Sequence, residues 1–177
     1  MKPFNVDETP IVLKTPRLTI IALDLENLYH YVHHYEVVHF NLEKTCAVFE
    51  HDPDIKYAFE NAYYQATNDP ERYFWYTSWE VVLMDSDVII GGLCFKGPPD
   101  ETGGLEVGYS IYDAFSGNGY ATEGLEALLE WATKVHNIRK FTASVEPDNV
   151  KSKRVLEKLK FRCVPINGDV EWWLKEI

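Results

Sequence analysis

Residues 105–121 read LEVGYSIYDAFSGNGYA, a β-rich run that passes through a glycine-rich turn into a helical pattern. The run 105–112 has the composition of a strand, and its internal Gly108 predicts a bulge or a close backbone approach. From Tyr120 to Val135, apolar residues recur at helical spacing. The stretch therefore predicts a strand, a tight turn and a helix in direct succession.

The turn predicts a binding site for an anion. The N–H groups of a first helical turn and the helix dipole favour a negative charge, and Gly117 and Gly119 let the backbone approach it. A small Ala121 allows the helix to pack closely. The same glycines are also compatible with a plain strand-to-helix connection. The turn is not a Walker loop, which needs Gly-Lys-Ser/Thr, and it lacks the third glycine of a dinucleotide fingerprint.

On either side of this stretch, alternating patterns predict an α/β (α+β) protein with a single domain over residues 1–177. One strand is expected over 14–23, followed by two helices, one capped by Asp24 and one over 54–68. A hairpin follows, with strands over 73–84 and 88–95. After the central helix, the expected elements are a strand over 141–145, a helix capped by Asp148 or Asn149, and two short strands near Cys163 and over 171–174.

The composition limits the possible partners. The formal net charge of -11 argues against general nucleic-acid binding, no apolar run is long enough to span a bilayer, and no signal peptide is apparent, so we expect a cytoplasmic protein. Residues 134–162 nevertheless hold nine basic and three acidic residues. This cluster predicts either a local polyanion site or a solvated helix face, and nucleic-acid binding through it is a rival hypothesis.

The turn and its neighbours resemble the GNAT N-acetyltransferase superfamily, whose acetyl-CoA turn has arginine or glutamine, two residues, glycine, one residue, then glycine or alanine. Ser116, Gly119 and Ala121 stand in that register. The resemblance continues upstream in EVGYSI (106–111) and downstream in EPDN (146–149), includes TPRL (15–18) near the start of the chain, and covers most of the chain. It is closest to the branch that acetylates the N-termini of ribosomal proteins (RimJ/RimL-type).

The resemblance implies a mixed, mostly antiparallel sheet with a V-shaped split, flanked by helices, and acetyl-CoA as the acyl donor. The residues that it implies for CoA binding lie on the split strand, in the turn and at the start of the last helix. They are Tyr109, Ile111, Ser116, Gly117, Asn118, Gly119, Tyr120, Ala121, Asn149 and Ser152. Lys151, Lys153 and Arg154 flank that helix start and are expected to meet the CoA phosphates. The N–H of Ile111 is expected near the thioester oxygen.

Three departures from the family pattern concern cofactor affinity and catalysis. Ser116 replaces the long arginine or glutamine donor, and Lys160 replaces the usual glycine before Phe161. Leu156 stands where many relatives have a tyrosine that protonates the departing thiolate, which leaves Ser152, a water or direct release for that role. For the general base, Glu106 is the first candidate and Glu146 the second, while a solvent-facing strand residue or a turn residue is the plain alternative for each.

The predicted activity is acetyl transfer to a primary amine, either a protein N-terminus or a small amine, by direct attack in a ternary complex. The alternative is a non-catalytic acyl-CoA-binding regulatory domain. We expect an amine acceptor as partner, no nucleic acid and no membrane, and leave a homodimer open. His30, His33 and His34 suit a surface cluster better than a metal site, so no metal is expected. Aromatics such as Trp75, Trp79, Trp172 and Trp173 belong to the core more often than to an acceptor pocket.

Overall fold

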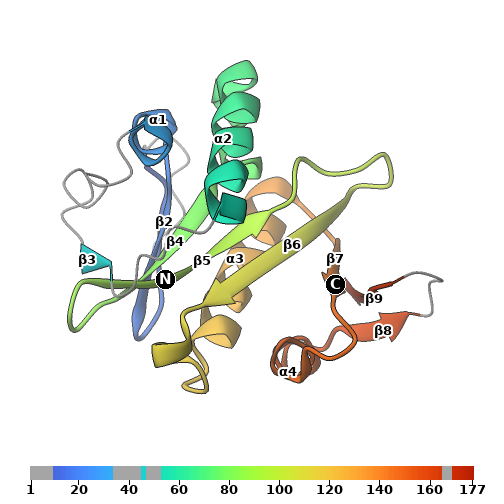
Figure 1. The fold of residues 1–177 in the computed structure, drawn as a ribbon. Coiled ribbons are helices and arrows are strands. Elements are labelled where there is room, and N and C mark those ends of the chain that lie inside the picture. Colours follow the sequence, from blue (N-terminus) through green and yellow to red (C-terminus); the bar gives the residue numbers. More distant parts are fainter. Residues whose placement is uncertain (1–9, 34–44, 47–52, 165–168) are drawn as a thin grey trace.

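The computed structural model describes residues 10–33, 45–46, 53–164 and 169–177 (Figure 1). The strands of these segments form a sheet in the order β1-β2-β4-β5-β6-β7-β9-β8, and the short β3 pairs with β5. The β6–β7 and β3–β5 pairs are parallel, and the others are antiparallel. The predicted mixed, mostly antiparallel α+β class is therefore confirmed.

The bounds of the elements follow the sequence patterns closely in the second half of the chain. The strands are β1 (Val12–Lys14), β2 (Leu18–Ala22), β3 (Thr45–Cys46), β4 (Ser78–Leu83), β5 (Val88–Phe95), β6 (Gly104–Ile111), β7 (Lys140–Val145), β8 (Arg162–Val164) and β9 (Glu171–Glu176). The helices are α1 (Leu25–His33), α2 (Pro53–Asn68), α3 (Tyr120–His136) and α4 (Val150–Lys158), with short 3-10 helices η1 (Pro70–Trp75) and η2 (Asp113–Phe115).

The sheet splits between its two parallel central strands. β6 pairs with β7 only through residues 104–106, which lie opposite 140–142. Beyond this point β6 stays paired with β5 while β7 stays paired with β9, and Figure 1 shows the two strands diverging. The expected V-shaped split is present, and it opens toward the glycine turn and the start of α4.

Three local predictions were wrong. The strand expected over 14–23 is two strands, because Pro16 lies in the turn between β1 and β2. Tyr73 belongs to η1 rather than to β4, since Pro70 starts a short helix there. The register shift lies in the β4–β5 pair near Val81, and Gly108 pairs regularly with Cys94. At Gly108 the close approach is to a side chain, because a Cβ would lie 3.0 Å from the Cys94 Sγ.

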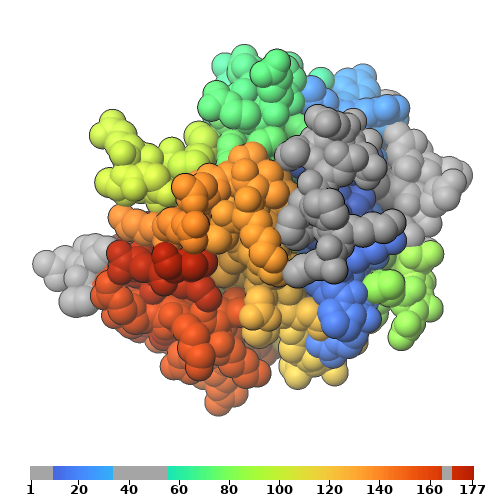
Figure 2. Space-filling view, turned by 180° about the vertical axis from the view of Figure 1, so that it is seen from behind, coloured from blue at the N-terminus to red at the C-terminus, as the bar shows by residue number. Residues whose placement is uncertain are grey.

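Helix α3 covers one face of the sheet and carries much of the core. Trp131 is buried against Trp79 of β4, with ring centroids 4.8 Å apart. Trp75 and Trp173 are buried as well, which supports a core role for these aromatics, while Trp172 is half-buried. In Figure 2, α3 lies between the N-terminal strands and the C-terminal segment with α4 and β9. None of the described helices is both long and apolar enough to cross a bilayer.

Candidate functional site

An outer cavity of about 490 Å³ opens at the glycine turn, on the split side of β6. Most of the residues expected to bind CoA line it: Tyr109, Ile111, Ser116, Gly117, Gly119, Tyr120, Ala121, Asn149 and Ser152. Asn118 differs, since it is not among the lining residues and its side chain donates to the Phe115 and Ser116 carbonyls. The Asn118 side-chain amide thus stabilises the turn through hydrogen bonds within it.

The turn leaves its backbone donors available. Gly117 and Gly119 have φ angles of 83° and 84°, and Gly119 is the N-cap of α3 without any side-chain hydrogen bond to the helix. The left-handed φ angles explain the need for glycine here, because few other residues adopt them. Lack of space does not explain it, since a Cβ at Gly117 would have no neighbour within 4 Å. The first N–H groups of α3 therefore point at the cavity without a capping side chain, which suits an anion.

Arg17, from the turn between β1 and β2, braces this site and was not predicted as a site residue. Its guanidinium donates to Glu123 Oε2 at 2.7 Å and to the Asn118 carbonyl at 3.1 Å, and it lies 4.6 Å from the centre of the Tyr120 ring. Thr15 Oγ1 donates to Glu123 Oε1 at 2.6 Å. Partial burial raises the pKa of Glu123, but these hydrogen bonds outweigh it and lower the pKa overall. Arg17 thus neutralises the carboxylate in the first turn of α3, where it would repel an anion.

Replacing Arg17 with alanine is expected to weaken binding of a phosphate-bearing ligand. The variant loses the bond to the Asn118 carbonyl and leaves the Glu123 charge beside the turn. A typical net hydrogen-bond contribution of roughly 0.5–1.5 kcal/mol converts to about a two- to tenfold higher Kd. Calorimetric titration with CoA measures it, with Arg72→Ala as a control, because Arg72 pairs with Asp69 away from the cavity. Unchanged affinity would remove Arg17 from the site.

An inner cavity of about 270 Å³ continues into the split. Tyr109, Asn149 and Ser152 line both cavities, so the two cavities are neighbours at these residues. The ladder bonds from Lys96 N to Glu106 O and from Tyr112 N to Ile90 O fix which β6 residues bond to β5. In an antiparallel pair the alternate residues point their N–H groups the other way. The backbone of Tyr109 and Ile111 therefore faces the split, where β7 no longer pairs.

Glu106 lies where the split begins. Its Oε1 accepts hydrogen bonds from Lys96 Nζ at 2.6 Å and from Ser144 Oγ at 2.8 Å. Both partners line the inner cavity, whereas Glu106 itself is not among its lining residues, so the carboxylate is held beside the cavity by two residues of its lining. Glu146 also lines the inner cavity, but it is exposed in the loop after β7. Both candidate bases thus lie near the same cavity, and Glu106 is the more enclosed.

The junction of the two cavities holds a pair of hydroxyls. Tyr109 Oη lies 2.7 Å from Ser152 Oγ and donates to the Ser152 carbonyl at 3.0 Å. Burial raises the pKa of Tyr109, and the Ser152 hydrogen bond opposes this rise. Asn149 caps α4 by accepting from the Ser152 N–H at 2.9 Å. Leu156 is fully buried in the core, so α4 presents no side chain from that position to the cavity.

The basic cluster divides between two roles. Lys151, Arg154 and Lys158 line the outer cavity. Lys153 instead donates to Glu171 at 2.6 Å and lines neither cavity, which corrects its expected contact with phosphate. Lys160 adopts a left-handed φ of 66°, the conformation that explains a glycine at this place in relatives. The outer cavity thus has its positive charge on the α4 side.

A buried acid on β4 was not predicted. Glu80 is only 4% exposed, and desolvation raises its pKa from 4.5 to about 7 against the opposing hydrogen bond from Ser78. The register places it opposite Gly92, which in turn lies opposite Ser110. By strand alternation it shares the sheet face with Glu106, two strands away. The sequence signal was a single acidic residue inside the apolar run 78–83.

The described residues contain no group of three or more His, Cys, Asp and Glu side chains suited to a metal ion. His30 and His33 lie on α1, where both rings contact Tyr29. His34, the third histidine considered, lies outside the described residues.

Several solved structures that share this fold are acetyltransferases. A putative ribosomal-protein-serine acetyltransferase from Vibrio cholerae superimposes with a TM-score of 0.68 at 14% identity, over 96% of this chain and all of the other. RimL, a ribosomal L7/L12 alpha-N-protein acetyltransferase in complex with coenzyme A, gives 0.67 at 17% identity, over 94% and 98% of the two chains. The split sheet and the uncapped turn thus define an acetyltransferase-type fold.

Residues 17–162 match the family described as the acetyltransferase (GNAT) domain, and the chain belongs to this family. An uncharacterised N-acetyltransferase of Bacillus subtilis, YjdG, is 33% identical over 99 residues, which make up 56% of this chain and 59% of the relative. A second one from Bacillus subtilis, YnaD, is 33% identical over 101 residues, 52% and 57% of the two chains. The chain thus spans little more than half the length of the curated relatives that it matches.

Proposed function

We propose that the chain is an acetyl-CoA-dependent N-acetyltransferase in which an amine attacks the thioester directly in a ternary complex. The observation that carries this proposal is that the two cavities share Tyr109, Asn149 and Ser152 as lining residues. The outer cavity lies at the uncapped glycine turn, and the inner one is lined by Lys96 and Ser144, which donate hydrogen bonds to the Glu106 carboxylate. A donor that is anionic at one end and reactive at the other fits this arrangement.

The outer cavity would hold the nucleotide end of acetyl-CoA. The N–H groups at the start of α3 suit the pyrophosphate, and Lys151 and Arg154 supply positive charge from the opposite wall. These backbone donors would compensate for the arginine or glutamine side chain that relatives have at the position of Ser116. The split-facing backbone of Tyr109 and Ile111 would pair with the pantetheine arm and bring the thioester to the inner cavity, with the Ile111 N–H as the oxyanion donor.

Three groups would carry the chemistry. Glu106 is the proposed base that removes a proton from the amine, directly or through water, with Glu146 as the second candidate. For the departing thiolate, the hydroxyl pair of Ser152 and Tyr109 is the proposed proton source. A tyrosine on β6 would then take the role that many relatives give to a tyrosine on the last helix, where this chain has Leu156.

Tyr109→Phe tests that assignment. We expect kcat to fall by about tenfold, below the 10²–10⁴-fold typical of proton transfer, because Ser152 retains its hydroxyl. Affinity for CoA should change little, since the backbone of β6 is kept. Steady-state kinetics with thiol detection provide the measurement, and Tyr76→Phe is the control, because the Tyr76 hydroxyl donates to Asp69 and lines neither cavity. A change confined to the KM for acetyl-CoA would make Tyr109 a binding residue only.

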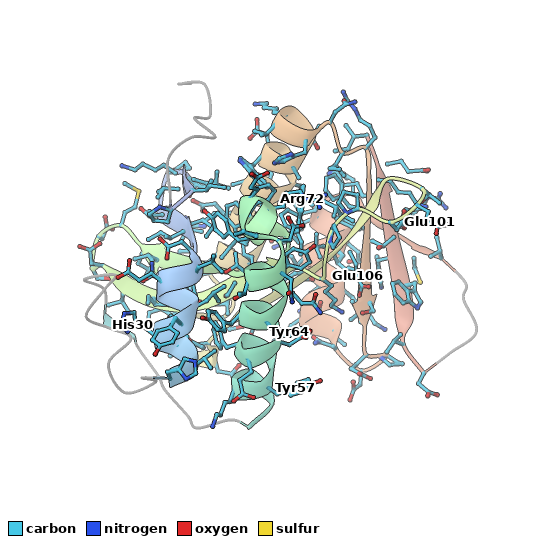
Figure 3. All side chains as sticks on the ribbon, turned by 90° about the horizontal axis from the view of Figure 1, so that it is seen from above. His30, Tyr57, Tyr64, Arg72, Glu101 and Glu106 are labelled. Atoms are coloured by element: carbon cyan, nitrogen blue, oxygen red, sulfur yellow. The ribbon has the colours of Figure 1, made fainter. Side chains whose placement is uncertain are left out.

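A peptide N-terminus is the proposed acceptor, with small amines as the alternative. Tyr57 and Tyr64 of α2 are 72% and 66% exposed, and Figure 3 shows them on the side of the helix that faces Glu106. Exposed tyrosines are common where proteins contact peptides. The solved neighbours include a ribosomal L7/L12 N-terminal acetyltransferase, which supports the RimJ/RimL-type branch.

An amine and peptide panel with thiol detection tests the function. Thiol release that depends on both acetyl-CoA and an acceptor supports it. Binding of acetyl-CoA without release across the panel would favour the regulatory acyl-CoA-binding alternative. No binding at all would exclude both. A gel shift at moderate salt examines the nucleic-acid rival, whose affinity would fall steeply as salt rises.

A further inference from the structure

The amine of Lys96 already occupies the split. Lys96 follows β5 directly, and its Nζ donates to Glu106 Oε1 at 2.6 Å and to Ser144 Oγ at 2.9 Å. These two acceptors belong to β6 and β7, on either side of the point where the strands part. A primary amine of the chain itself therefore lies against the carboxylate proposed as the base.

The absence of a side chain at Gly108 leaves room for the Lys96 side chain to cross β6. A Cβ at Gly108 would lie 3.6 Å from Lys96 Cε and 3.0 Å from Cys94 Sγ, so a larger side chain would fill the space over β6. Lys96 can therefore cross β6 from β5 and reach Ser144 on β7. The side chain remains 45% exposed and is not locked in the core.

Lys96 also lines the inner cavity, together with Tyr109 and Ser152 from the junction with the outer cavity. This inference rests on the proposed function, in which the thioester lies in that cavity. The nucleophile and the thioester would then share one cavity, with the base hydrogen-bonded to the nucleophile, and such positioning is what accelerates a bimolecular reaction.

We propose that Lys96 is an acetylation site, modified by the chain's own activity. Glu106 takes one proton from the Lys96 ammonium, and the freed nitrogen attacks the thioester carbonyl. The C–S bond breaks as the C–N bond forms, and the thiolate takes up one proton from the Tyr109 and Ser152 hydroxyl pair. The second proton that the nitrogen loses on amide formation restores that hydroxyl pair through solvent. The products are an uncharged acetyl-lysine, free CoA thiol and one proton, which Glu106 releases to solvent.

Lys153 is a second lysine that pairs with a glutamate, but self-acetylation is not expected there. It also donates to a glutamate, Glu171, at 2.6 Å and is less exposed than Lys96, at 22%. It lines neither cavity, so a thioester bound there would not meet it. Lys153→Arg is therefore the matched control for Lys96→Arg.

The experiment incubates the folded full chain with acetyl-CoA and no acceptor, then measures intact mass and maps the modified peptide. We expect a gain of one acetyl group at Lys96, retained in Lys153→Arg, absent in Lys96→Arg and slowed in Glu106→Gln. Urea-unfolded chain should not show this preference for Lys96. A parallel assay with the amine and peptide panel reports thiol release.

The outcomes separate the two proposals. Acetylation of external amines with Lys96 unmodified overturns this inference and leaves the proposed function in place. Modification spread evenly over lysines, in folded and unfolded chain alike, also overturns it, as it indicates spontaneous chemistry. Acetylation at Lys96 without turnover of any external amine supports this inference but not transfer to an external acceptor. Failure to bind acetyl-CoA overturns both.

Discussion

Glu106→Gln is expected to lower kcat/KM by about 10²–10⁴-fold, the range typical for loss of a general base. The amide can still accept hydrogen bonds from Lys96 and Ser144, which hold the carboxylate at 2.6 Å and 2.8 Å. It cannot take a proton from the attacking amine at neutral pH. Binding of CoA, which involves the outer cavity, should be preserved. Thiol release at saturating acetyl-CoA measures the loss.

Glu171→Gln is the matched control for this substitution. Glu171 accepts from Lys153 at 2.6 Å, and its side chain is 33% exposed against 26% for Glu106. It therefore reports the effect of removing a paired carboxylate outside the split. If Glu106→Gln retained wild-type kcat/KM, Glu106 would be a structural partner of Lys96, and Glu146→Gln would be the next variant to measure.

Glu80→Gln is expected to change how stability depends on pH. Because burial raises the pKa of Glu80 from 4.5 to about 7, the folded state binds its proton more tightly than the unfolded state. The stabilisation is present in full below pH 4.5 and is lost as the pH rises through about 7. The size of the shift corresponds to about 3 kcal/mol. Glutamine has no such titration.

Urea unfolding of both proteins across pH 4.5–8 provides the test. The free energy of unfolding of Glu80→Gln minus that of the wild type should rise by about 3 kcal/mol over this range. Taking the difference cancels the titration of all other groups. Glu126→Gln, at an exposed position of α3, should give a difference that changes far less. A flat difference for Glu80→Gln would mean that Glu80 is solvated in the folded protein.

Glu106 and Glu80 lie on the same face of the sheet but in different surroundings. Glu106, at the split, is partly exposed and pairs with Lys96. Glu80, within the continuous part of the sheet, has a hydroxyl partner and almost no exposure, which favours the protonated form. The split thus leaves Glu106, and not Glu80, beside the cavity where the base is proposed to act.

The sequence by itself determined the features that depend on neighbouring residues. Positive φ angles at Gly117 and Gly119, the helix that follows and the Asn149 cap are local, because each involves residues within a few positions. The strand run 105–112 and the turn could therefore be identified together, and the resemblance they support led to the split sheet. The same local reasoning failed at Pro16 and Tyr73, where a turn and a short helix interrupt β-rich composition.

Only the tertiary structure decided which distant side chains meet. Arg17 reaches Glu123, 106 residues away, and Ser144 reaches Glu106, 38 residues away. Neither contact has a periodic signal, since both depend on strand order and on the point where β6 leaves β7. The burial of Glu80 and the position of the Lys96 amine depend on the same packing. The glycine turn could be predicted because backbone angles are local, whereas the proposed acid, the proposed base and their partners were brought together by the fold.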